Sequence, residues 1–136
     1  MNTFALDTNI ISFMVKGDEV VCNAFRSANS EQNIFVIPIP AYYEIRRGLL
    51  AVNALTQMKA FDKLCESFDI KEMNLESWEM AANIWANLRR RGSPVGKDDG
   101  DIFIAATCIV NDYTLVTDNT CDFIRIEGLK FVNWKQ

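Results

Sequence analysis

Short apolar runs rich in β-forming residues alternate with longer amphipathic segments along this chain, and this alternation limits the fold more than any other feature. Strands are expected at residues 2–6, 33–40, 69–74, 113–119 and 129–134. Most of the segments between them carry apolar residues at helical spacing. Strands joined through helices build a parallel sheet that is covered by helices on both faces. The sequence therefore predicts an α/β fold.

Local signals support the helices of this pattern. Gly17 follows the first helical segment as a stop signal, Pro40 suits a first helical turn, and Asn74 can cap the helix that follows it. In that last helix Trp78 and Trp85 belong to one stripe, which we expect to be core or dimer surface rather than a base-stacking platform. No linker or repeat interrupts the chain, so residues 1–136 are expected to form one domain.

Composition narrows the class of protein. The 136 residues carry a net charge of −4, which argues against binding nucleic acid by bulk charge alone. The four cysteines form no closely spaced pair and are expected to be free thiols, as in a reducing cytoplasm. No secretory signal is recognised, and the longest apolar run, residues 102–110, is too short to cross a bilayer. We therefore expect a cytoplasmic protein with no membrane contact.

The chain contains no histidine. This excludes Ser-His-Asp and Cys-His nucleophile pairs, histidine acid–base catalysis and histidine zinc sites. Any chemistry must depend on carboxylates, which prefer hard cations such as Mg²⁺ or Mn²⁺.

Four acids stand where such a site is expected: Asp7, Glu44, Asp101 and Asp118. Asp7 and Asp118 follow predicted strands, Glu44 lies in the helix after the second strand, and Asp101 opens an apolar helix. In a doubly wound sheet these places share one edge, so the side chains are expected to converge on one pocket. A divalent cation would relieve their repulsion and promote hydrolysis of a phosphate ester.

Simpler roles exist for each acid taken alone. Asp7 can cap a helix, Asp118 can belong to a turn, and Glu44 can be a solvated helix position. Asp101 is harder to explain in this way, because the residues after it are nearly all apolar and an idle acid there is costly. Arg46 and Arg47 lie within one turn of Glu44, and either a solvated position or a contact with a phosphate backbone is possible for them.

The motifs "ALDTNIIS", "YYEIRRGLL", "VGKDDGDIFIAA" and "YTLVTDNTCDF", in this order and followed by "LKFVNW", resemble the PIN-domain ribonucleases. They are most similar to the VapC toxins of bacterial type II toxin–antitoxin pairs. The resemblance implies a three-layer α/β/α sandwich and an Mg²⁺-dependent RNA endonuclease, in which Mn²⁺ can substitute. It also implies an RNA substrate, a homodimer, and a VapB-like, DNA-binding antitoxin as partner.

The resemblance also assigns roles to residues. Asp7 and Asp101 would hold the metal ion, and Glu44 and Asp118 would complete the pocket. Asn9, Arg46 and Arg47 are candidate substrate contacts. The loop "KDDGD" is longer and more acidic than the usual version, so on a looser count Asp98 or Asp99 could be the third acid, whereas the D-x-x-I-A-A spacing selects Asp101. Asp98 and Asp99 lie in the loop and can swing into water, and Asp99 is kept as a further candidate ligand.

Two other classes of protein gather acids around Mg²⁺ at a sheet edge. A receiver-like signalling module needs paired acids after the first strand and a lysine after a late strand, and this chain has neither. A haloacid-dehalogenase-type phosphatase needs D-x-D after the first strand, where this chain has D-x-N. A nuclease that has lost its activity and only binds a partner is a third alternative, which the presence of all four acids disfavours.

Overall fold

The computed structural model describes residues 2–93 and 98–136. Its strands are β1 (Thr3–Leu6), β2 (Ile34–Pro38), β3 (Asp69–Lys71), β4 (Thr114–Val116) and β5 (Lys130–Val132). Its helices are α1 (Thr8–Val15), α2 (Glu19–Ser30), α3 (Ile39–Ala51), α4 (Leu55–Ser67), α5 (Leu75–Arg90), α6 (Gly100–Asn111) and α7 (Thr120–Phe123). Each strand predicted from the sequence is present, and the short helix α7 is an addition to the prediction.

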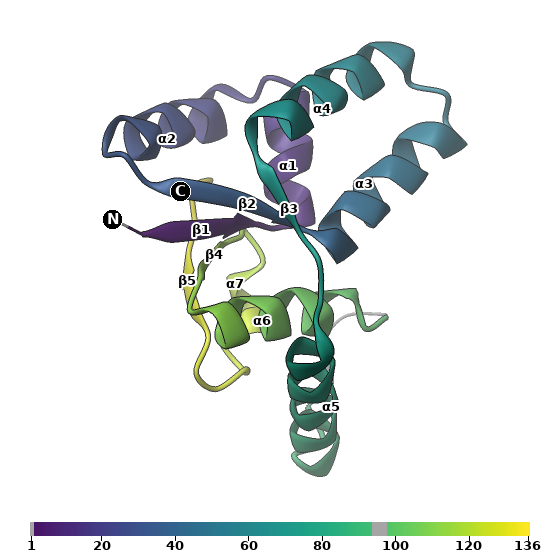
Figure 1. Ribbon diagram of the computed structural model, residues 1–136, viewed down its shortest axis with the longest axis vertical. Helices are drawn as coiled ribbons and strands as arrows, with labels where there is room; N and C mark the ends of the chain where they lie inside the picture. Colours follow the sequence, from purple (N-terminus) through teal and green to yellow (C-terminus); the bar gives the residue numbers. More distant parts are fainter. Residues whose placement is uncertain (1, 94–97) are drawn as a thin grey trace.

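The strands form one parallel sheet in the order β3-β2-β1-β4-β5. Figure 1 shows α1, α2 and α4 on one side of the strands and α5 and α6 on the other, while α3 leaves the end of β2. The predicted α/β/α sandwich with a central parallel sheet is therefore confirmed. Within the described ranges, no helix is both long enough and apolar enough to cross a membrane.

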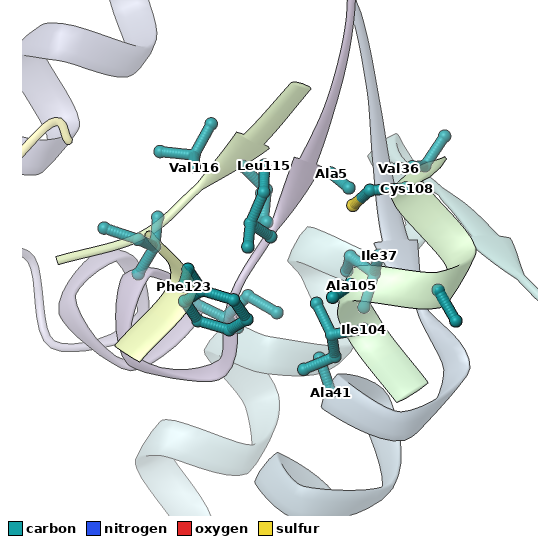
Figure 2. Packing of buried hydrophobic residues seen from close by; sticks show 14 of the residues in the cluster. Ala5, Val36, Ile37, Ala41, Ile104, Ala105, Cys108, Leu115, Val116 and Phe123 are labelled. Carbon is teal, nitrogen blue, oxygen red and sulfur yellow. The ribbon is translucent and has the colours of Figure 1, made fainter. Parts of the chain in front are cut away.

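The core explains why α6 has almost no polar face. This helix packs beneath β1 and β4, and Ile104, Ala105 and Cys108 are completely buried there, beside Leu115 of β4 (Figure 2). Burying so many apolar side chains contributes most of the stability of such a layer. The position of α6 against the sheet is thereby fixed, and with it the position of the acid in its first turn.

Candidate active site

Two of the predicted acids follow neighbouring parallel strands. Leu6 at the end of β1 lies opposite Val116 at the end of β4. One residue further on, the backbone N–H of Asp7 donates to the Val116 carbonyl at 3.0 Å. Asp7 and Thr117 are thereby placed side by side at the carboxyl edge of the sheet, which is the edge where ligands bind in open α/β folds.

Asp7 is buried, with 3% of its surface exposed. One of its carboxylate oxygens accepts a hydrogen bond from Thr8 N at 2.8 Å, and the other accepts one from Thr117 Oγ1 at 2.7 Å. Burial raises the pKa of Asp7, the two hydrogen bonds oppose that rise, and the negative charge of Asp118 adds to it. Asp7 does occupy the N-cap position of α1, but a cap needs neither this burial nor the bond from Thr117.

Glu44 reaches the same place from α3. The Thr8 hydroxyl donates to Glu44 Oε2 at 3.2 Å, so Thr8 connects Asp7 with Glu44. Burial raises the pKa of Glu44, and the charges of Asp98 and Asp7 raise it further, while the Thr8 bond and Arg47 act in the opposite direction. The alternative that Glu44 is simply a solvated helix position does not fit this environment.

Asp101 lies in the first turn of α6, as the sequence predicted. Burial and the nearby charges of Asp7, Glu44, Asp122 and Asp98 raise its pKa to about 7. Such a perturbed carboxyl group in a cluster of acids is typical of a functional site.

Asp118 completes the set of four. It lies directly after Thr117, and its Oδ1 accepts a hydrogen bond from Asn9 Nδ2 at 3.4 Å. The negative charge of Asp118 acts on Asp7. The structure therefore brings Asp7, Glu44, Asp101 and Asp118 to one edge of the sheet, with Asn9 beside them.

The loop before α6 carries two further acids, Asp98 and Asp99. Asp98 is exposed, as expected, and its Oδ1 accepts a hydrogen bond from Gly100 N at 2.8 Å. Its charge acts on both Glu44 and Asp101. Asp99 is exposed as well and borders two apolar cavities beside Trp78 and Phe103, one of which Asp98 also lines. The placement favours Asp98 over Asp99 as the additional acid of the site.

Sequence reasoning missed three side chains at the site, Thr8, Thr117 and Asp122. The two threonines, Thr8 and Thr117, each stand next to a predicted acid, and a hydroxyl in that position was a signal that could have identified them. Asp122 raises the pKa of Asp101 from the unexpected helix α7, where Arg125 and Asn119 hold it at 2.9 and 3.0 Å. No local pattern indicated that α7 would turn toward α6.

The two candidate phosphate-binding arginines have different surroundings. Arg46 forms a 2.6 Å ion pair with Asp62 of α4 and lies over the rings of Tyr42 and Phe61. Arg47 is exposed, and its charge acts on Glu44. The contacts of Arg46 are therefore directed toward α4, and Arg47 is the better placed of the two to meet a substrate.

The donor set fits a hard divalent cation. The site offers carboxylate oxygens, and burial, together with the charges of neighbouring acids, raises the pKa values of Asp7, Glu44 and Asp101. A bound cation favours the charged form of such carboxylates and relieves the repulsion between them. In residues 2–93 and 98–136 no three acids form a ready-made metal-ligand group. A cation would then be held by few protein oxygens and by water, which is how proteins usually bind Mg²⁺.

Comparisons with known proteins show which sequences and folds this chain is similar to. The chain is 27% identical to Ribonuclease VapC1 of Haemophilus influenzae strain R2866 over 133 residues, which are 96% of this chain and 97% of the relative. VapBC-1 from nontypeable Haemophilus influenzae matches with a TM-score of 0.81 and 25% identity, covering 98% of this chain and 99% of that one.

A second solved structure, DNA-bound VapBC from Salmonella typhimurium, matches with a TM-score of 0.82 and 25% identity over 98% of this chain and 99% of that chain. VapBC2 from Rickettsia felis, bound to a promoter DNA fragment, shares the fold with a TM-score of 0.87 at 22% identity, over 97% and 98% of the two chains. The PIN domain family matches residues 4–129. The resemblance found in the sequence is thus confirmed, and the chain belongs to the PIN domain family.

Proposed function

We propose that this protein is a divalent-metal-dependent endoribonuclease that acts as the toxin of a type II toxin–antitoxin pair. The observation that carries the proposal is the buried Asp7 carboxylate, held by Thr117 and Thr8 among Glu44 and Asp101. The names of its relatives support the ribonuclease activity and the toxin role.

Each residue of the site has a distinct role in this proposal. Asp7 and Asp101 would hold Mg²⁺ or Mn²⁺, and Glu44 and Asp118 would supply further negative charge around it. When bound, the cation stabilises charge on the scissile phosphate and makes water more acidic. Thr8 and Thr117 keep Asp7 in one orientation, and Arg47 offers positive charge to the RNA backbone. Without histidine, proton transfer falls to carboxylates or to water.

Expression of the chain alone in a bacterium tests this function. We expect growth to stop and RNA to be cut at defined sites, while the Asp7→Asn variant, produced to the same level, leaves growth and RNA intact. Growth arrest that is equally strong with Asp7→Asn would mean that the toxicity does not come from this site.

We propose further that the protein forms a homodimer and is neutralised by a DNA-binding antitoxin. The solved VapBC complexes support a partner of this kind. A cluster of acids attracts a guanidinium or an ammonium group as well as a metal ion. We therefore expect the antitoxin to place an Arg or Lys among the four acids. A structure of the complex in which all four acids stay open to solvent would contradict this mode of inhibition.

A further inference from the structure

An apolar cavity of about 350 Å³ opens beside the four acids, between α3, α5 and the entry to α6. Its apolar lining consists of Ile39, Pro40, Tyr43, Met73, Trp78 and Phe103. Its remaining lining comes from Gly100, the acids Glu44, Asp98 and Asp99, and Arg47. Because Glu44 belongs to the acidic site as well, a molecule held at the acids can extend directly into this cavity.

Two aromatic side chains of this cavity remain accessible. Tyr43 is 59% exposed and Trp78 is 48% exposed, so the interpretation of Trp78 as a core residue is excluded. The Trp78 ring meets Phe103 edge to face, with centroids 5.0 Å apart. This contact limits the freedom of the indole while much of its surface stays open. A restrained, accessible aromatic ring is suited to stacking with another flat ring.

Positive charge lies at the same cavity. The Arg47 guanidinium carbon is 5.0 Å from the centroid of the Tyr43 ring, and Arg47 is one of the residues that line the cavity. A group that fits here therefore meets aromatic surface, one guanidinium and the neighbouring acidic site together. An apolar side chain of a protein partner would use only the first of these features.

We infer that this cavity is a subsite for one unstacked nucleobase of single-stranded RNA, next to the phosphate that is cleaved. The inference rests on the proposed function and deepens it. The base stacks on Trp78 and Tyr43, and Arg47 contacts the adjoining backbone. Proteins commonly bind single-stranded RNA in this way, with aromatic side chains for the bases and cations for the phosphates.

A matched pair of tryptophan variants tests the subsite. Trp85 lies on the same helix and is 42% exposed, but it borders a neighbouring cavity and stacks on Arg89 at 4.4 Å. Cleavage by the full chain is measured on a synthetic single-stranded RNA that contains a mapped cleavage site. We expect Trp78→Leu and Tyr43→Leu to lower kcat/KM by roughly tenfold or more, as for the loss of one stacked base, and Trp85→Leu to change it less than twofold.

The decisive comparison removes the base instead of the ring. The same RNA is made with an abasic ribose at each position beside the cleaved bond. At one of these positions, removal of the base should lower kcat/KM for wild type and for Trp85→Leu. We expect the factor to equal the one by which Trp78→Leu lowers kcat/KM on intact RNA. On that abasic RNA, Trp78→Leu should lose nothing more, because its stacking partner is already absent.

Several results would overturn the subsite. One is equal activity of the Trp78→Leu and Trp85→Leu variants. Another is a kcat/KM of Trp78→Leu on abasic RNA that is lowered by the product of the two separate factors, because the base and the ring would then act independently. Sedimentation can give a further contradicting result. If Trp78→Leu only causes a dimer of the protein to dissociate, and full activity returns at high protein concentration, this face is a contact between two copies of the chain. Binding of an oligoadenylate ten-mer in EDTA is measured in parallel. Wild-type protein that neither binds nor cleaves RNA would refute both proposals, whereas cleavage that is indifferent to Trp78 would refute the subsite alone.

Discussion

At the scale of single residues, the orientation of the acids depends on hydroxyl groups. Thr117 is completely buried; its Oγ1 donates to Asp7 at 2.7 Å and accepts from Asn119 N at 2.9 Å. One side chain therefore connects the acid after β1 with the turn after β4. A buried polar group that loses such a partner keeps the full cost of its desolvation.

Replacing this hydroxyl should destabilise the protein and reduce its activity. For Thr117→Val we expect the free energy of unfolding to fall by about 1–3 kcal/mol, because Asp7 and Asn119 each lose a partner. Thr107→Val is the control, because Thr107 is equally buried but its hydroxyl donates only to the Phe103 carbonyl within α6. The free energy of unfolding of this variant should fall by less than about 1 kcal/mol. Urea unfolding measures both variants, and equal losses would contradict the role given to Thr117.

The raised pKa of Asp101 makes a prediction about pH. Its pKa of about 7 lies above its ordinary value of 3.8, so the folded state binds this proton more tightly than the unfolded chain. The associated stability is present below pH 4 and is lost as the pH rises to 7. Asp101→Asn removes this loss. Without metal, the melting temperature of Asp101→Asn minus that of wild type should therefore increase between pH 4 and 7 and stay constant above pH 7.

Thermal unfolding in EDTA at several pH values measures this difference. Asp118→Asn serves as the comparison, since Asp118 neighbours the same cluster and its charge acts on Asp7. A difference between Asp101→Asn and wild type that is constant across this pH range would contradict the environment assigned to Asp101.

The sequence predicted that the four acids would meet, because Asp7 and Asp118 follow predictable strands, Asp101 begins a predictable helix and Glu44 lies in the helix after the second strand. It named Asp98 and Asp99 only as alternatives for the third acid and did not identify Asp122, because their positions depend on how the loop before α6 and the short helix α7 turn in three dimensions. It also could not separate Arg46 from Arg47. Their difference depends on Asp62, which lies sixteen residues further along on α4.

At the scale of secondary-structure elements, the entry to α6 approaches α3 closely. A Cβ atom added to Gly100 would clash with Glu44 Oε1 and lie 3.0 Å from Asp98 Oδ1. The absence of a side chain at Gly100 is therefore what allows Glu44 and Asp98 to occupy this region together.

Adding a methyl group at Gly100 should affect activity more than stability. In Gly100→Ala the Glu44 carboxylate, at the end of a flexible side chain, moves away and loses its bond from Thr8. We expect cleavage to fall on the order of 100-fold. Gly48→Ala is the control, because Gly48 lies inside α3 with open space around it. We expect this variant to keep its activity and its free energy of unfolding to rise by up to about 1 kcal/mol. Comparable activity of both variants would exclude the positioning role of Gly100.

At the scale of the whole molecule, the alternation of strands and helices was enough to predict a parallel sheet with helices on both faces. The strand order β3-β2-β1-β4-β5 was not predictable in the same way, because parallel strands of similar composition carry no signal for their neighbours. This order places β1 between β2 and β4, the strands that lead to Glu44 and Asp118. The convergence of the acids is thus a property of the fold.

The central claim is that the four acids form one metal-dependent site that cleaves RNA. Its most direct test is RNA cleavage by purified protein freed of metal and titrated with Mg²⁺, with Asp101→Asn measured beside the wild type. We expect wild type to be inactive in EDTA and to recover fully with Mg²⁺ or Mn²⁺ but not with Zn²⁺, while Asp101→Asn stays inactive throughout. Wild-type cleavage that persists in EDTA, or an active Asp101→Asn variant, would contradict the claim.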